Sequence, residues 1–446
     1  MSFTGVLFMI AFLAGCLMAL VRSPIYGLLT YVGAFYLHPP SRWWGAGILH
    51  DIRWSLIAAA VTALALLLRR ERTRGTPFLR QGVVWGIISF YCWILLQSIW
   101  AIDATQQALL VEYYFKFFVT LFLIYKCVDS ERNLQLFMWS HVLGCFYFGW
   151  IAYTSYTGGR FEDFGGPGLS EANAAALTMV TGTLFAASLF LGGNWRKKGI
   201  LAGLVTFIVN GIVTTISRSG FLAMAIGGVV YNFFAPARFS RRVRQLSVVA
   251  LVLFALLTNP LYWVRIQSIK YQGEQVEGVD TGGGRLEIMA AQLQMFQAHP
   301  FGCGHMCTEI LSPAYMDPMF LSAGEGRRSS HNTFMSLLVD QGVVGGLFYA
   351  LMLLWILISL RSLARKFRGS QSTLATLFPA IAGALIAMSV GDMFVPYVRY
   401  EVRFWFIGVL LAMHQLVQRE RETLSTSNSS AVGTTTLPLV RLERSR

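Results

Sequence analysis

Apolar runs recur along the whole chain and are separated by short polar segments. Thirteen runs are present, of which the second and ninth are short: 4–21, 24–37, 52–68, 82–101, 108–126, 134–155, 173–192, 199–216, 220–234, 246–264, 336–360, 374–394 and 402–417. A helix of about 20 apolar residues crosses a hydrocarbon core about 30 Å thick. The pattern therefore predicts an all-α, polytopic transmembrane helical bundle of about 12 spans, or 13 if both short runs cross.

The composition agrees with a chain embedded in a lipid bilayer. Of the 446 residues, 55% are hydrophobic and 13% are charged, whereas a soluble domain carries about a quarter charged residues. The net charge of +14 would suggest nucleic acid as a partner of a soluble protein. Here the basic residues fall mainly in short loops between apolar runs, which is typical of loops that face anionic lipid. We therefore expect the lipid bilayer, and no nucleic acid, as a partner.

Basic clusters mark alternate loops as cytoplasmic. They lie at 69–80, 196–198, 238–244 and 361–368, which leaves 38–51, 156–172, 217–219 and 265–335 on the opposite face. The expected organisation is transmembrane helices with short loops over 1–264, one large periplasmic loop over 265–335, C-terminal transmembrane helices over 336–417, and a disordered cytoplasmic tail over 418–446.

The segment 265–335 is by far the longest connection, and a long connection among short ones is usually functional. Residues 284–298 have the apolar spacing of an amphipathic helix. Cys303 and Cys307 share this external segment, where a disulfide and two free thiols are both open alternatives. With His299 and His305, these cysteines match no zinc-binding spacing, so we expect no metal.

Three external residues are candidates for chemistry, because a charge near the membrane is costly. Arg218 lies in the turn Ser217-Arg218-Ser219, where its guanidinium either binds phosphate or reaches lipid headgroups. Arg285 follows three glycines and either binds an anion at a helix start or pairs with a neighbouring carboxylate. His331 precedes an apolar run and is either a general base, since imidazole titrates near neutral pH, or an ordinary interfacial histidine.

The order of these motifs resembles the O-antigen ligase (WaaL) and Wzy polymerase superfamily of membrane glycosyltransferases. The likeness covers about 155–350. Four elements carry it: Gly159–Gly165 followed by Glu171-Ala172-Asn173, similar to an external Arg…Gly…Asn element; the Ser217-Arg218 turn; Arg285 with His299–Gly304, similar to an Arg…Pro…Gly-x-Gly stretch; and Ser330–Thr333 with Gln341–Gly345, similar to a His-Asn element. The section through Tyr36-Leu37-His38-Pro39-Pro40 is also similar to a branch found beside exosortase systems.

The resemblance implies a GT-C-like bundle in the bacterial inner membrane with an active site facing the periplasm. It implies transfer of a glycan from undecaprenyl diphosphate to lipid A–core oligosaccharide, without a cofactor or metal and with inversion. His331, Arg218 and Arg285 would be catalytic, and Arg160, Asn173 and Asn332 would bind substrate.

Two alternatives remain open at this point. A polymerase or a protein O-oligosaccharyltransferase of the same superfamily would use another acceptor. A transporter or lipid flippase would belong to a different class, but its charges would lie near the bilayer midplane and its halves would often be similar. The notable charges of this chain instead gather at one face.

Overall fold

The computed structural model of the chain describes residues 2–69, 76–166, 168–169, 171–257, 285–321 and 326–432. Within these ranges the secondary structure is helical and contains no strand. The helices are α1 (Phe3–Val21), α2 (Ile25–Leu37), α3 (Ile48–Asp51), α4 (Trp54–Leu68), α5 (Gly82–Gln97), α6 (Ala104–Cys127), α7 (Glu131–Ser155), α8 (Ala172–Gly192), α9 (Trp195–Thr214), α10 (Arg218–Phe234), α11 (Ser240–Leu257), α13 (Arg285–Ala298), α14 (Cys307–Tyr315), α15 (Thr333–Asp340), α16 (Gly342–Phe367), α17 (Thr373–Gly391) and α18 (Glu401–Val432).

Within the described residues each predicted apolar run coincides with a helix, but the run at 336–360 is not one continuous helix. It is divided between α15 and α16, because Gly342 has a φ of +67°, which a residue with a side chain rarely adopts. A Cβ at Gly342 would lie 2.3 Å from the backbone of Phe301. The break therefore lets the loop before α14 approach the helix backbone closely.

The described helices confirm an all-α, multi-pass membrane protein. Seven are long and apolar enough to cross a membrane, or up to eight if α10 and α11, which are bent by 117°, form one span. Helices α2, α4 and α5 have 13, 15 and 16 residues, fewer than the roughly 20 that a full crossing needs. Full-length spans in the described part of the chain are thus fewer than the 12 expected.

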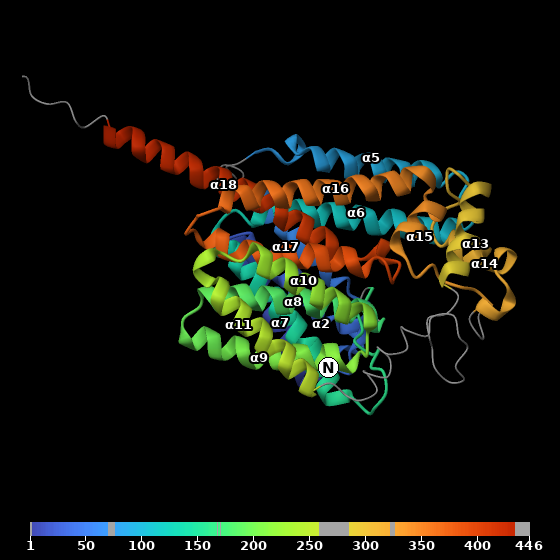
Figure 1. The fold of residues 1–446 in the computed structure, drawn as a ribbon, viewed down its shortest axis with the longest axis horizontal. Coiled ribbons are helices and arrows are strands. Elements are labelled where there is room, and N and C mark those ends of the chain that lie inside the picture. The colour runs from blue at the N-terminus through green and yellow to red at the C-terminus, as the bar shows by residue number, and fades with distance from the viewer. Residues whose placement is uncertain are drawn as a thin grey trace, which may run out of the picture.

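Helices α8, α10 and α17 form the centre of the bundle and lie side by side (Figure 1). In α8 and α17, 78% and 83% of the residues in the apolar window are buried. Gly227 of α10 faces Gly383 of α17, where a Cβ on Gly227 would lie 3.1 Å from the Gly383 carbonyl oxygen. Small residues at such a crossing let two backbones pack closely in a membrane protein.

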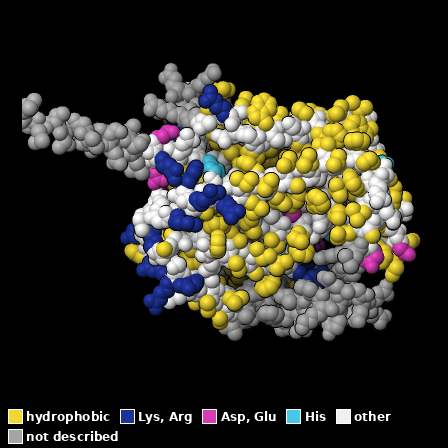
Figure 2. Space-filling model, turned by 45° about the horizontal axis from the view of Figure 1, so that its top comes forward, with side chains coloured by type: hydrophobic (Ala, Val, Ile, Leu, Met, Phe, Trp, Pro, Cys, Tyr) yellow, Lys and Arg dark blue, Asp and Glu magenta, His cyan; other side chains and the backbone are white. Residues whose placement is uncertain are grey.

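The two ends of the bundle differ in charge. Figure 2 shows Lys and Arg side chains gathered at the end from which α18 emerges, and an apolar surface beyond them. We call this the basic end; it carries Arg69, Arg80 and residues 196–198, 238–244 and 361–368. The opposite end carries α13, α14 and α15 (Figure 1). The basic clusters recognised in the sequence thus share one end of the fold.

The C-terminal helix is longer than predicted. We expected a disordered tail from residue 418, but α18 continues to Val432, so the prediction is wrong for 418–432. Residues 433–446 lie outside the described residues, as do residues 265–284 of the predicted large loop.

Candidate active site

The predicted site residues come from segments at the end of the bundle opposite to the basic end (Figure 1). These segments lie between the long helices there, and their described residues together are called the loop end: 38–53, 98–103, 156–166, 168–169, 171, 215–217, 299–321, 326–333 and 392–400. Three of the six candidate residues (Arg160, His331 and Asn332) lie in them, and Asn173, Arg218 and Arg285 lie in the first turns of α8, α10 and α13.

The turn between α9 and α10 is attached to the start of α8. Ser217 caps α10 by accepting a hydrogen bond from the N–H of Gly220 at 3.0 Å, and its hydroxyl donates to Asn173 Oδ1 at 2.7 Å. Ile216 has a φ of +45°, which is unusual for a β-branched residue and makes the turn sharp. Arg218 is the first residue of α10 and is half-buried. The predicted residues Asn173 and Arg218 are therefore brought together.

The segment that contains Arg160 lies beside this turn. Phe161 donates its backbone N–H to the carbonyl of the last residue of α9 at 3.0 Å, and Arg160 Nε lies 3.1 Å from Glu162 Oε1. Burial raises the pKa of Glu171, the residue before α8; the charge of Arg160 opposes this shift, and Glu162 and Glu309 add to it. Arg160 therefore lies near the start of α8, as Asn173 does.

The His331 segment is attached to the end of α17. Asn332 caps α15, and Thr333 donates its backbone N–H to the Asp392 carbonyl at 2.8 Å. The Thr333 hydroxyl donates to the Val395 carbonyl at 2.7 Å. His331 is half-buried and has a φ of +49°, a left-handed conformation that is uncommon for a residue other than glycine. This conformation turns the chain into α15.

The packing of α10 against α17 brings the Arg218 turn and the His331 segment to adjacent helix ends. Arg218 precedes the crossing at Gly227 by nine residues, and Asp392 follows the crossing at Gly383 by nine residues. At 1.5 Å per residue, both lie about 13 Å from the crossing on the same side. Since Asp392 holds the residue two positions after His331, the two predicted catalytic elements lie at the same level of the bundle.

Asp392 also joins a buried ion pair. Its carboxylate pairs with Arg403 of α18 and accepts a hydrogen bond from the Tyr349 hydroxyl of α16 at 2.6 Å. The side chains of Asp392 and Arg403 are 2% and 6% exposed, so each charge depends on the other for solvation. The pair fixes the end of α17, and through Thr333 it fixes the His331 segment.

Arg285 begins α13, so a helix is present where the sequence predicted one at 284–298. The side chain of Arg285 lies outside the described residues. Its role beside Arg218 and His331 stays a prediction.

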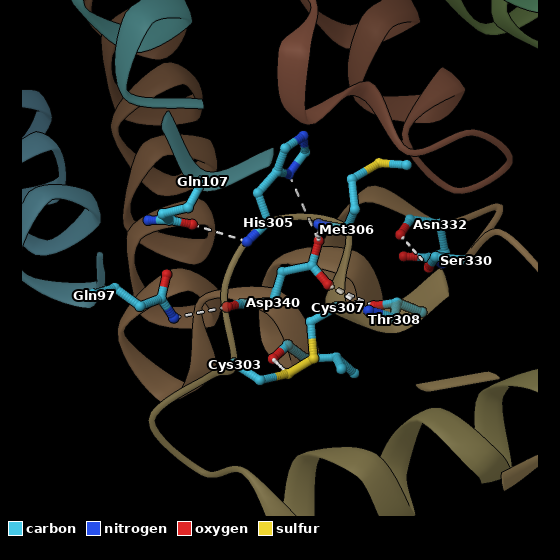
Figure 3. A network of polar contacts seen from close by, with 11 residues as sticks. Gln97, Gln107, Cys303, His305, Met306, Cys307, Thr308, Ser330, Asn332 and Asp340 are labelled. Atoms are coloured by element: carbon cyan, nitrogen blue, oxygen red, sulfur yellow. Dashed lines mark hydrogen bonds and ion pairs between the residues drawn. A yellow bond between two sulfur atoms is a disulfide. The ribbon is translucent and has the colours of Figure 1, made fainter. Parts of the chain in front are cut away.

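The segment before α14 is held against the break between α15 and α16 (Figure 3). The Asp340 carboxylate accepts hydrogen bonds from Met306 N at 3.0 Å, Thr308 N at 2.9 Å and the Thr308 hydroxyl at 2.7 Å. The Asp340 carbonyl accepts from the Gln97 side chain of α5 at 2.7 Å and from Gly304 N at 3.0 Å. Asp340, the last residue of α15, thus connects α5 and the loop to the helix that follows His331.

Comparison with known families bears on this arrangement. The model of the O-antigen ligase family matches residues 202–350, about a third of the chain. Over residues 202–350 the chain is therefore similar to the O-antigen ligase superfamily. The resemblance in the order of the motifs is thereby confirmed, and a function of ligase or polymerase type is indicated in general. No curated protein shows a significant match to the chain. Kinship with the exosortase-associated branch stays a prediction.

The ligase-family match begins in α9 and ends in α16. It therefore contains the Arg218 turn, Arg285 and the His331-Asn332 element. Arg160 and Asn173 lie before it in the sequence, and the structure brings them to the Arg218 turn through the contacts of α8 and α9.

Within the ligase-family region, Cys303 and Cys307 form a disulfide with a Cα–Cα distance of 5.7 Å. This resolves the two alternatives left open by the sequence. Beside it, the His305 backbone N–H donates to Gln107 Oε1 at 2.9 Å, and the His305 ring lies 3.8 Å from Asp340 Oδ2. The disulfide and this contact hold the chain between α13 and α14.

Burial favours the uncharged forms of both His305 and Asp340. Burial lowers the pKa of His305 to about 3, and the charge of Arg399 adds to the shift. Burial raises the pKa of Asp340 to about 7, although its hydrogen bonds from Thr308 and Met306 oppose the change. The imidazole is therefore uncharged at neutral pH, and His305 and Asp340 do not form an ion pair.

Asp340 and Arg403 are not among the site residues that the sequence predicts. A signal was available, because each is a charged residue inside a predicted apolar run, where a charge is costly unless it is paired. The sequence did not reveal their partners, which lie 32 and 11 positions away.

Proposed function

We propose that this protein is an O-antigen ligase. It transfers a glycan from undecaprenyl diphosphate to lipid A–core oligosaccharide at the periplasmic face of the bacterial inner membrane, without a metal and with inversion. One observation carries the proposal: the Arg218 turn and the His331 segment, both inside the family match, stand at adjacent helix ends at one level of the bundle.

Arg218 and Arg285 bind the donor diphosphate in this proposal. The diphosphate lies at the headgroup level of the membrane, which is where the loop end would stand. A guanidinium presents a fixed pair of N–H donors that matches phosphate oxygens. Because bond breaking adds negative charge to the leaving diphosphate, a preorganised cation there stabilises the transition state. Arg160, Asn173 and Asn332 form further substrate contacts.

His331 removes the proton from the acceptor hydroxyl. The acceptor oxygen bonds to the anomeric carbon while the bond between that carbon and the diphosphate oxygen breaks. The proton goes to the imidazole, and undecaprenyl diphosphate leaves with the electron pair. Attack from the face opposite to the leaving group inverts the anomeric centre. Positioned proton transfer of this kind typically contributes about 10²–10⁴-fold to a rate.

Two features support a periplasmic location of the loop end. The Lys and Arg clusters stand at the opposite end (Figure 2), as expected for a cytoplasmic face. The Cys303–Cys307 disulfide at the loop end suits an oxidising compartment.

The decisive experiment is reconstitution of the purified protein in liposomes with a labelled undecaprenyl-diphosphate glycan. Three acceptors are supplied in turn: lipid A–core, a second lipid-linked repeat unit, and an acceptor protein. Label on lipid A–core alone supports the ligase. Lengthened lipid-linked glycan or labelled protein would instead show a polymerase or a protein O-oligosaccharyltransferase. Translocated donor without any product would show a transporter or flippase and overturn the proposal.

A further inference from the structure

A groove of about 220 Å³ lies at the basic end, between the α8–α9 junction and α11. Phe190 near the end of α8 and Lys198 in the first turns of α9 form one side. Arg242, Leu246 and Val249 of α11 form the other. The groove is far along the bundle from the candidate active site, because α8 runs its full length between them.

In the part of the chain that the structure describes, no acidic neighbour neutralises the cations of this groove. Lys198 is half-buried and its ammonium lies 5.6 Å from the centroid of the Phe190 ring. Among the residues that the structure describes, no carboxylate lies within ion-pair distance of Lys198 or Arg242. The sequence contains no Asp or Glu between Glu171 and Glu274. An anion entering the groove therefore meets two cations without competition.

The remainder of the groove is apolar and open. Leu246 and Val249 are 43% and 53% exposed, and they lie one and two turns from Arg242 along α11. Helix α11 departs from α10 at a bend of 117° and packs mainly on α10 and on the short helix η5 (Ala237–Phe239). Its side toward α8 is thus left with a gap, which is the groove.

A ligand that matches both the cationic part and the apolar part of the groove must combine an anionic headgroup with a hydrocarbon chain. We propose that the groove binds an anionic glycerophospholipid of the leaflet at the basic end, such as phosphatidylglycerol or cardiolipin. The phosphate contacts Lys198 and Arg242, and an acyl chain lies along Phe190, Leu246 and Val249. A zwitterionic lipid gains less here, because its headgroup has no net charge to attract the cations. Free phosphate would leave the apolar part of the groove exposed.

Native mass spectrometry of the detergent-purified protein tests this site with phosphatidylglycerol and phosphatidylethanolamine as probes. In the Lys198→Gln/Arg242→Gln variant, selectivity for phosphatidylglycerol should fall about 30-fold, since each cation near an anionic headgroup contributes about fivefold. The matched control is Arg196→Gln/Arg241→Gln, which removes the same charge from exposed residues that do not line the groove. Its selectivity should change by about twofold or less.

A second variant leaves both cations in place. Gln245→Glu puts a carboxylate on a residue that lines the groove and should lower phosphatidylglycerol affinity about fivefold. Glycerol phosphate is added as a competitor without acyl chains and should not displace the lipid. Equal losses in the groove variant and its control, unchanged binding in both groove variants, or displacement by glycerol phosphate would each overturn the proposal. None of these readouts depends on catalysis.

Discussion

The Ser217 hydroxyl donates a hydrogen bond of 2.7 Å to Asn173 Oδ1, across 44 positions of the sequence. The same hydroxyl accepts a hydrogen bond from the first turn of α10. One serine therefore fixes the turn that carries Arg218 and also connects it to α8, the second most buried full-length span in the described part of the chain. In the proposed reaction, this connection would hold the Arg218 guanidinium at a fixed position relative to the donor diphosphate.

Replacing Asn173 by alanine should therefore damage catalysis more than folding. The variant removes the hydrogen bond from Ser217 to Asn173, and because Ser219 Oγ lies 3.0 Å from Ser217 Oγ and can accept instead, the loss of stability should be about 1 kcal/mol. Loosening the Arg218 turn should lower the transfer rate about 10- to 100-fold, since a displacement of about 1 Å has effects of this size. The control is Asn194→Ala, which removes a helix cap at the other end of the bundle at a cost of about 1 kcal/mol. Equal transfer rates in both variants would contradict this role.

Arg218→Lys keeps the positive charge but removes the fork of N–H donors. If the guanidinium binds phosphate, losing one charge-assisted hydrogen bond should lower transfer about 10- to 100-fold, since such bonds contribute about 1.5–3 kcal/mol. Transfer is measured in liposomes with the labelled donor, and Arg196→Lys at the basic end is the control. A normal rate for Arg218→Lys would favour the alternative in which Arg218 only reaches lipid headgroups.

His331→Asn tests the general base without disturbing the left-handed backbone, because asparagine tolerates a positive φ. Transfer should fall about 10²–10⁴-fold, while the amount of folded protein in the membrane stays the same. His50→Asn, at an exposed histidine of the loop end, should leave transfer unchanged. Full activity of the His331 variant would exclude the base role.

The Asp392–Arg403 pair makes a prediction about stability. Asp392→Asn leaves the Arg403 charge buried without a counter-charge and should destabilise the protein by roughly 3–5 kcal/mol. The double variant Asp392→Asn/Arg403→Gln removes both charges, so its loss should be smaller than the sum of the two single losses. Thermal unfolding of the purified variants measures this coupling. Additive losses would show that the two side chains do not interact.

His305 makes a prediction about pH. Because burial lowers the pKa of its imidazole to about 3, the folded state binds fewer protons than the unfolded state between pH 3 and about 6.5. Its contribution to stability is therefore complete above pH 6.5 and decreases by about 1 kcal/mol per pH unit below it. As the pH falls from 6.5 to 5, the melting temperature of the wild type should decrease more than that of His305→Gln. The comparison isolates His305, because Asp340 is present in both proteins. A difference in melting temperature between the two proteins that stays constant over this pH range would contradict the lowered pKa of His305.

The sequence by itself determined which segments are helices, which end carries the basic clusters and in which order the ligase motifs follow. These features depend on local properties, namely the length of each apolar run, the placement of Lys and Arg, and short motifs. The structure confirms the helices, including α13.

Only the tertiary structure decided which of these elements meet. It showed the hydrogen bonds between Ser217 and Asn173 and between Thr333 and Asp392. It also showed that the loop before α14 packs against the break at Gly342 and that Cys303 and Cys307 form a disulfide. Neither the division of one predicted span into α15 and α16 nor the extension of α18 beyond residue 418 was apparent in the hydropathy pattern. The physical reason is that these contacts depend on packing between residues distant in sequence, whereas hydropathy records only the preference of each residue for lipid or water.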